Sequence, residues 1–237
     1  IYAYGFRNPW TFSQDPATGK IYSSDSGQNT IQEVNRVLPG RNYGWRAKEG
    51  SFLFDPVTSN VGSLHNAPTI DGLEDPIVEY DHGQGYANII GGHIYRGSLI
   101  PELQGAYICG DYGGELFYVE GLNNSPTLKR FQIGVTDRAL LSDVRAFSVD
   151  AAGEIYFVGN SNGQSSLYKI VPLAHLDIST TTDEVELTVT GDEGSQITLK
   201  KSSDLDFTNS EDTTVNGGKL NLTYPLEDQA FFRVVAE

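Results

Sequence analysis

Short apolar stretches bounded by glycine, aspartate and asparagine recur along the chain, and no segment keeps a helical period of apolar residues. Stretches of this kind are typical of β-strands joined by tight turns. One unit occurs twice, because FSQDPATGKIYSSDSG begins at Phe12 and FSVDAAGEIYFVGNSNG begins at Phe147. Each copy predicts two strands connected by a turn that ends at glycine. The pattern therefore predicts an all-β chain.

The spacing of the repeats predicts the architecture. The two copies are 135 residues apart, which equals three units of about 45 residues, the size of a four-stranded propeller blade. A looser copy, AYICGDYGGELFYV, lies between them, with Tyr107 placed 85 residues after Tyr22 and 49 before Tyr156. A β-propeller is predicted, and a β-sandwich is the alternative. Residues 1–172 have room for three to four blades, fewer than most rings need, so we expect an incomplete ring with exposed edges.

The composition changes after residue 172. Residues 173–237 are rich in Thr, Ser and Asp, and Val185, Leu187 and Val189 alternate with polar residues. Such alternation is typical of half-buried strands. We interpret residues 173–237 as a small β-sandwich-like accessory module. It holds no constellation of reactive residues, so a spacer, anchoring or export role is expected.

Charge and cysteine content narrow the possible partners. With 31 acidic and 16 basic residues, the net charge is −15, which argues against nucleic acid or an anionic membrane surface as partner. No run approaches the roughly 18 apolar residues of a membrane span. These features are typical of a secreted protein, and we expect an extracellular or periplasmic location.

The single cysteine, Cys109, excludes an internal disulfide and is predicted to be a buried structural thiol.

Several separated motifs resemble the glucose/sorbosone dehydrogenase family of quinoprotein six-bladed propellers. They are Arg7-Asn8-Pro9, Asp25-Ser26-Gly27-Gln28, Glu33-Val34-Asn35 and Asn42-Tyr43-Gly44-Trp45, followed in the family's order by IIGGHIYRG, IPELQGAYICGDYGGELF and FSVDAAGEIYFV. Hedgehog-interacting-protein-like members share YGFRNPW, DSGQN and NYGWRAKEG. The resemblance implies that residues 1–172 are the C-terminal half of a six-bladed propeller, completed by an N-terminal half or a companion chain. The lack of methionine agrees with the expectation of a processed or truncated piece.

The resemblance also implies a chemistry. In catalytic members, calcium and pyrroloquinoline quinone (PQQ) sit in a cleft at the ring's centre, where a histidine takes the proton of a sugar hydroxyl and hydride passes to the quinone. Arg7 matches the arginine that stabilises developing negative charge, and Asn8 matches a cofactor hydrogen-bonding position. Gly27 and Gln28 match the positions whose carbonyls hold calcium. Each of these has a structural alternative, because an arginine can tie strands together and the others are common turn residues.

Departures from the family pattern weaken the catalytic expectation. The family's catalytic histidine lies before the arginine motif, and His65, His82, His93 and His175 show no ligand spacing. We expect all four to be ordinary loop or strand residues.

The cations that neutralise the three quinone carboxylates are also unmatched. Catalytic members use a lysine and an Arg-x-Arg pair, where this chain has Tyr112, Ser142 and Val144, with Arg145 displaced by one residue and Glu115 nearby. Two functions therefore stay open. One is PQQ-dependent oxidation of a sugar hydroxyl; the other is a non-catalytic propeller that binds carbohydrate or protein or serves a structural role.

Overall fold

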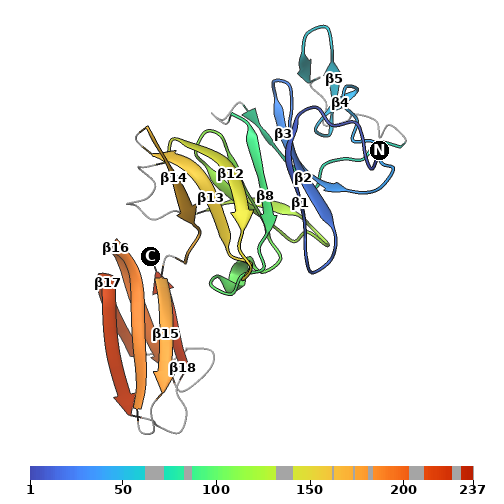
Figure 1. Ribbon diagram of the computed structural model, residues 1–237. Coiled ribbons are helices and arrows are strands. Elements are labelled where there is room, and N and C mark those ends of the chain that lie inside the picture. Colours follow the sequence, from blue (N-terminus) through green and yellow to red (C-terminus); the bar gives the residue numbers. More distant parts are fainter. Residues whose placement is uncertain are drawn as a thin grey trace. The chain divides into compact units, whose positions relative to one another are not determined.

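A computed structural model describes residues 1–61, 72–82, 87–131, 141–161, 163–172, 174–180, 184–202, 211–225 and 231–236. His65 lies outside these ranges. The described secondary structure is almost entirely β-strand, with no α-helix in the described ranges (Figure 1). Contacts divide the chain into two compact units. The first holds residues 1–131 and 141–170, and the second holds the strands after residue 170.

The first unit contains three successive antiparallel sheets whose strands follow one another in chain order. The first sheet consists of β1 (Pro9–Gln14), β2 (Ile21–Ser26), β3 (Ile31–Val37) and β7 (Val78–Asp81). The second consists of β8 (Ile89–Ile94), β9 (Tyr107–Asp111), β10 (Leu116–Glu120) and β11 (Thr127–Arg130). The third consists of β12 (Asp143–Val149), β13 (Ile155–Ser161) and β14 (Gln164–Lys169).

The first strands of the three sheets lie together. Strand β8 contacts both β1 and β12. The first strand of each sheet therefore lies next to the first strand of the adjacent sheet (Figure 1). Meandering sheets arranged in this way are consecutive blades of a β-propeller. We refer to the three sheets as the first, second and third blade, and to β1, β8 and β12 as the inner strands.

The repeated F-S-x-D unit has a local physical cause. In the β1–β2 turn, the carboxylate of Asp15 accepts the N–H of Ala17 at 3.1 Å. The carboxylate of Asp150 accepts the N–H of Ala152 at 2.9 Å in the β12–β13 turn. An aspartate that bonds the backbone two residues further on is a strong turn former. Each repeat thus encodes the hairpin formed by the first two strands of a blade.

Residues 1–170 hold three blades, the lower of the predicted three to four, but the repeat spacing was misread. Tyr22, Tyr107 and Tyr156 all lie on the second strand of a blade, so the 85 residues between the first two span one blade and not two. The first blade is lengthened by residues 38–77, which contain a three-stranded sheet. Its strands are β4 (Lys48–Glu49), β5 (Phe52–Asp55) and β6 (Asn60–Val61).

The core lies between the blades. The interface of the first and second blades buries an apolar cluster of Tyr22, Val34, Ile89, Ile94, Tyr107, Cys109, Phe117 and Val119. The thiol of Cys109 is fully buried, and burial raises its pKa, which confirms the prediction of a structural thiol. Between the second and third blades, Gly110 leaves room for Phe147, whose ring would lie 3.2 Å from a Cβ at that position.

The second unit is a small β-sandwich-like module built on two long strands. Its strands are β15 (Ala174–Thr180), β16 (Glu184–Ser202), β17 (Glu211–Pro225) and β18 (Phe231–Ala236). Strand β16 pairs with β17 along most of its length, with β15 along its first half and with β18 along its second half. Leu187, Val189 and Leu199 are buried, so the alternation predicted for the first two is confirmed.

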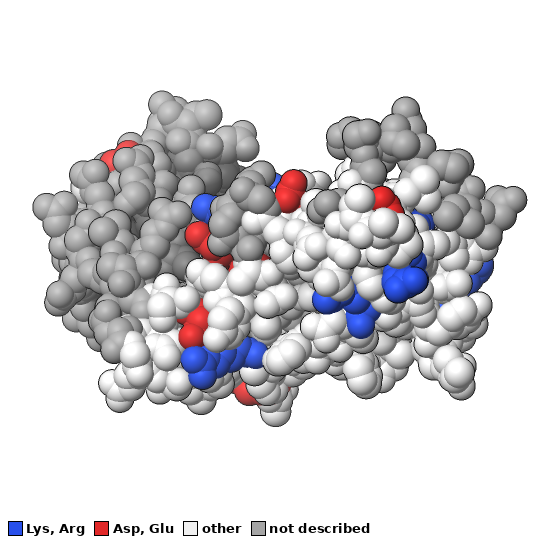
Figure 2. Space-filling model, turned by 90° about the horizontal axis from the view of Figure 1, so that it is seen from above, with Lys and Arg blue, Asp and Glu red and all other residues white. Residues whose placement is uncertain are grey.

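Basic and acidic side chains are scattered over the face seen in Figure 2, without a broad basic patch among the described residues. Within the described ranges, no helix has the length and apolarity needed to cross a membrane.

Candidate functional site

Arg7 and the β2–β3 turn, which the sequence placed 20 residues apart, are in direct contact. The guanidinium of Arg7 donates from Nε to Oε1 of Gln28 at 2.9 Å and from Nη1 to the carbonyl of Ser26 at 3.0 Å. It also lies over the ring of Trp45, with Cζ 5.7 Å from the ring centroid. The structure thus brings together the predicted site residues Arg7, Gln28 and the adjoining Gly27. Arg7 thus holds this turn through two side-chain hydrogen bonds.

A buried carboxylate holds the Arg7-Asn8 peptide in place. The backbone N–H of Arg7 donates to Oδ2 of Asp25 at 2.8 Å, and that of Asn8 donates to Oδ1 at 2.6 Å. Burial raises the pKa of Asp25 to about 6, although these two hydrogen bonds and the Arg7 charge oppose the rise. Asp25 therefore fixes the start of β1, and with it the position of Asn8.

A second buried carboxylate shapes the turn from its other side. Oε1 of Glu49 accepts the backbone N–H groups of Asn29, Thr30 and Ile31 at 3.1, 2.7 and 2.9 Å. A Cβ at Gly27 would lie 2.1 Å from the carbonyl oxygen of Ile31 and 2.4 Å from Oε1 of Glu49. Only glycine fits here. The requirement comes from the close approach of both the Ile31 carbonyl and the Glu49 side chain, which the sequence motif alone does not reveal.

Three acidic side chains meet on neighbouring strands behind the turn. Asp25 is the register partner of Glu33, and Glu33 is the partner of Glu79. Burial, followed by the charges of Asp25 and Glu79, raises the pKa of Glu33 well above its ordinary value. The ammonium of Lys48 is buried nearby and pairs with Asp75. Carboxyl groups therefore gather behind the turn, where burial favours their neutral forms.

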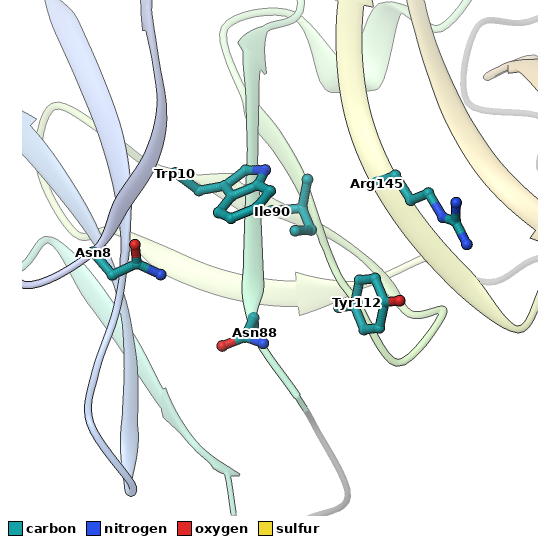
Figure 3. A pocket seen from close by; sticks show the side chains of 6 residues that line it. All are labelled: Asn8, Trp10, Asn88, Ile90, Tyr112 and Arg145. Atoms are coloured by element: carbon teal, nitrogen blue, oxygen red, sulfur yellow. The ribbon is translucent and has the colours of Figure 1, made fainter.

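Asn8 lines a pocket formed at the inner strands of all three blades (Figure 3). The pocket has a volume of about 340 Å³, and its lining residues are Asn8, Trp10, Asn88, Ile90, Tyr112 and Arg145. The rings of Trp10 and Tyr112 are 59% and 46% exposed. In the part of the chain that the structure describes, no hydrogen bond involves the side-chain amides of Asn8 or Asn88. The pocket thus offers two accessible aromatic rings and two amides with free hydrogen-bonding capacity.

Arg145 is the one cation among the described residues that line the pocket, and a carboxylate already neutralises it. Its Nε and Nη2 both donate to the carboxylate of Asp143 at 2.9 Å. In Figure 3 the guanidinium points away from the other five side chains. A forked arginine–carboxylate pair uses the donors that a ligand's carboxylate would need. Arg145 therefore brings little free positive charge to the pocket.

The other positions expected to bear cations have structural roles. Tyr112 lies in the turn after β9, where Asp111 accepts the N–H groups of Ala87 and Gly113, both at 2.7 Å. Ser142 donates its hydroxyl to the carbonyl of Asn160, and Val144 is fully buried. Of these three residues only Tyr112 lines the pocket, and none of them brings a positive charge to it.

Three of the four histidines lie in described parts of the chain. His82 follows β7 and contacts the side chain of Gln32, and burial lowers its pKa. His93 lies on β8, where burial also lowers its pKa. His175 belongs to β15 of the second unit. None of the three lines the pocket.

The pocket does not fit a tricarboxylate quinone. Such a ligand needs cations to offset its charge, whereas the described lining offers only the neutralised Arg145. The turn fits calcium better, because no described group donates to the carbonyls of Gly27 or Gln28. However, no group of three or more His, Cys, Asp or Glu side chains in the described ranges could hold a metal ion.

Sequence reasoning missed several residues that build this region. Trp10, Asn88 and Ile90 line the pocket, and Asp25 and Glu49 fix the backbone around it. The exposed Trp10 gave a local signal, since a tryptophan directly follows the Arg-Asn-Pro motif. Asn88 and Glu49 gave none, because only the packing of separate strands brings them to the site.

Comparisons with known proteins agree with this architecture. The family model "Glucose / Sorbosone dehydrogenase" matches residues 1–169. HIPL2 protein of Arabidopsis thaliana is 38% identical over 120 residues, which cover 47% of this chain and 16% of that protein. HIPL1 protein of the same plant is 35% identical over 122 residues, covering 48% and 17%.

Solved structures share the fold of the first unit. A glucose dehydrogenase crystal structure matches with a TM-score of 0.55 at 22% identity, over 73% of this chain and 47% of that one. The apo-form of the soluble aldose sugar dehydrogenase from Escherichia coli matches with a TM-score of 0.54 at 19% identity, over 73% and 47%. The chain thus spans about half the length of these structures. The predicted fold is confirmed as an all-β chain with part of a six-bladed propeller and a small β-sandwich-like module. Because the family model covers 169 of 237 residues, the chain belongs to the glucose/sorbosone dehydrogenase family.

Proposed function

We propose that this chain carries the carbohydrate-binding face of a family propeller that does not perform quinone-dependent oxidation. The observation that carries the proposal is the composition of the pocket at the inner strands. Two exposed rings, Trp10 and Tyr112, stand beside two free amides, and its single described cation is bound to Asp143.

This combination suits the surface of a neutral sugar. A pyranose has apolar C–H faces that pack on aromatic rings, and hydroxyl groups that both donate and accept hydrogen bonds. The amides of Asn8 and Asn88 can do the same. A volume of about 340 Å³ lies at the small end of ligand pockets, which run from roughly 300 to 1,000 Å³.

The described blades form only part of the ring that would enclose this pocket. Three blades make up half of a six-bladed propeller, so we infer that three further blades, from an N-terminal half or a companion chain, close the ring around this pocket. An extracellular or periplasmic location, where carbohydrate ligands are abundant, stays a prediction.

PQQ-dependent sugar oxidation is the second candidate. The favouring observation is the contact between Arg7 and Gln28 at the turn whose free carbonyls match calcium-binding positions. The pairing of Arg145 with Asp143 disfavours it, because the described pocket lining then offers no unpaired cation.

A fluorescence titration separates the two candidates. The chain has two tryptophans, so Trp45→Phe leaves Trp10 as the only tryptophan reporter in the pocket. We expect saturable quenching by glucose, galactose or xylose with Kd on the order of 1 mM, and no saturable binding of PQQ when calcium is present. Saturable PQQ binding would overturn the proposal in favour of the enzyme. The absence of quenching by any of the sugars would remove the carbohydrate-binding role.

A further inference from the structure

Asn8 and Asn88 occupy equivalent positions in the first two blades. Each directly precedes the first residue of its inner strand, and that residue is the register partner of a buried aspartate, Asp25 on β2 or Asp111 on β9. The carbonyl of each asparagine also accepts the N–H of the residue after that aspartate, at 3.3 Å in the first blade and 2.8 Å in the second. Adjacent blades thus present the same side chain, a primary amide, at the same level of the pocket.

The backbone before both amides is held in the same way. In the first blade, the N–H of Arg7 donates to the carboxylate of Asp25 at 2.8 Å. In the second blade, the N–H of Ala87 donates to the carboxylate of Asp111 at 2.7 Å. Arg7 and Ala87 are the residues directly before the two pocket asparagines. Because a buried carboxylate that loses its hydrogen bonds is costly, both backbone segments are held firmly.

A buried glutamine of the first blade holds the backbone of Asn88 on both sides. Gln32 lies on β3 and is 0% exposed. Its Nε2 donates to the carbonyl of Ala87 at 2.9 Å, and its Oε1 accepts the N–H of Ile89 at 3.0 Å. Gln32 therefore bonds the residue before Asn88 and the residue after it, and it ties the second blade to the first at this point.

The third blade differs at this place. Its inner strand pairs Asp143 with Asn160, so the residue equivalent to Asn8 and Asn88 is Ser142. The hydroxyl of Ser142 donates to the carbonyl of Asn160 at 3.1 Å, and Ser142 does not line the pocket. The matched amides therefore belong to the first two blades, whose contact holds them.

We propose that Asn8 and Asn88 are a pair of specificity-determining amides that bind two hydroxyl groups of one pyranose, and that Gln32 is the positioning residue for Asn88. The inference rests on the proposed function, because it assigns the ligand of that same pocket. Figure 3 shows the two amides at the start of adjacent inner strands, with Trp10 and Ile90 beside them. A primary amide both donates and accepts hydrogen bonds, as a hydroxyl does. The site therefore takes a neutral pyranose that carries no substituent on these two hydroxyl groups.

The bonds around Asn88 give this pair its affinity for a weakly held ligand. Ordering a flexible segment on binding costs free energy, and a segment that is already held in its bound position avoids that cost. Gln32 and Asp111 hold the segment that carries Asn88 before any ligand arrives. Loss of the Gln32 bonds should therefore weaken sugar binding although Gln32 does not line the pocket.

Sugar titrations of single variants test the two amides. In the Trp45→Phe chain, where Trp10 reports binding, Asn8→Ala and Asn88→Ala should each weaken glucose binding by about threefold to tenfold, the effect of losing one neutral hydrogen bond. Asn124→Ala is the matched control, because Asn124 is exposed in the turn between β10 and β11 and lies outside this pocket. It should leave glucose binding unchanged.

Monodeoxy derivatives of glucose identify the hydroxyl that each amide binds. One derivative should bind the parent chain more weakly than glucose does, whereas Asn88→Ala should bind that derivative and glucose equally. A different derivative should show the same relation with Asn8→Ala. Losses that add for every combination of derivative and variant would overturn the assigned contacts.

Gln32→Leu tests the positioning role. It removes both hydrogen bonds around Asn88 and should weaken glucose binding by about threefold to tenfold. Added to Asn88→Ala it should leave the Kd for glucose unchanged, whereas a merely structural role would change stability alone. Gln32→Glu, which keeps an acceptor for Ile89 and loses the donor to Ala87, should give a smaller loss in the same direction.

The outcomes separate this inference from the proposed function. A parent chain that binds glucose and an Asn88→Ala variant that binds it equally well would overturn the inference and leave the sugar-binding function in place. A parent chain that binds none of the sugars would remove both. Because Asn88 is an exposed side chain, its substitution leaves the fold intact, and this result does not depend on how the Gln32 variants fold.

Discussion

The guanidinium of Arg7 donates a hydrogen bond to the side chain of Gln28 at 2.9 Å, across 21 residues of sequence. Family resemblance assigned both residues to one cofactor site, Arg7 to the quinone and Gln28 to calcium. Their contact shows that both belong to one place in the fold. It also shows that Arg7 makes contacts within the protein itself. Its contribution to the free energy of unfolding can therefore be measured by substitution.

Arg7→Ala should destabilise the first unit. The substitution removes the hydrogen bonds to Gln28 and Ser26 and the stacking on Trp45, and we expect a loss of about 1–2 kcal/mol. Both tryptophans lie in the first unit, so their fluorescence during denaturant unfolding reports this unit alone. As a control, Arg41→Ala removes a surface pair with Glu74 and should cost less than about 0.5 kcal/mol. Equal losses for the two variants would contradict the role of Arg7.

Gly27→Ala should cost more than an ordinary turn glycine. Its Cβ would meet the carbonyl of Ile31 at 2.1 Å and Glu49 at 2.4 Å, so the turn backbone must move. We expect a loss of about 2–3 kcal/mol in the same unfolding measurement. Gly40→Ala serves as comparison, because Gly40 has a φ of +75° but no atom within 4 Å of a Cβ. Its loss should stay near 1 kcal/mol, the cost of the left-handed backbone alone.

The ion pair of Asp15 with Arg96 should make stability depend on acid pH. Burial works to raise the pKa of Asp15, but the hydrogen bonds and charge of Arg96, with bonds from Thr18 and Ala17, outweigh it and lower the pKa from 3.8 to about 2. A pKa lowered in the folded state means that the stabilisation is present above pH ~4 and is lost as the pH falls toward ~2. Asp15→Asn should remove about 1–2 kcal/mol at pH 7 and flatten this part of the pH profile of unfolding.

The chain contains a matched control for this experiment. Asp55 begins the same D-P-x-T turn as Asp15 and accepts the same two local hydrogen bonds, from Val57 N–H and the Thr58 hydroxyl, both at 2.8 Å. It is exposed, and no arginine in the described ranges is paired with it. Asp55→Asn should therefore change the acid profile far less. If the two variants behaved alike, the turn would account for the effect and Arg96 would not.

The sequence predicted those parts of the fold that local chemistry determines. The aspartate and glycine of each F-S-x-D unit form a hairpin by themselves, and the tyrosine that follows marks the second strand of a blade. The alternation of Leu187 and Val189 likewise predicted a half-buried strand. The number of blades was harder to predict, because the insertion of residues 38–77 between β3 and β7 changes the spacing without changing the repeated unit.

The site could be predicted only in part, for a similar reason. Arg7, Asn8, Gly27 and Gln28 belong to contiguous motifs, and the structure brings Arg7 to the turn that contains Gly27 and Gln28. Asn88, Ile90 and Arg145 join Asn8 in the pocket only because three inner strands meet there. The pairing of Arg145 with Asp143 also depends on side-chain geometry, and it determines whether the pocket holds a free positive charge.

The pocket's lack of free positive charge can be reversed by substitution. Family resemblance places Tyr112 at the position expected to carry a lysine in catalytic members, and its ring lines the pocket. Tyr112→Lys adds a cation there, and Asp143→Asn releases the guanidinium of Arg145 from its carboxylate. Each change should strengthen PQQ binding, measured by fluorescence titration with calcium present, by about tenfold, since one charge-assisted contact contributes at least about 1.4 kcal/mol. The double variant should gain more than either single one.

A matched variant separates charge from shape in this experiment. Tyr112→Phe keeps the ring and adds no cation, so it should leave PQQ binding as weak as in the wild type. Sugar binding should respond in the opposite sense, because Tyr112→Lys removes one of the two aromatic rings while Tyr112→Phe preserves both. Tight PQQ binding by the unchanged protein would show that the described lining is not what limits the cofactor. The electrostatic argument against quinone chemistry would then fail, whatever the sugar titrations gave.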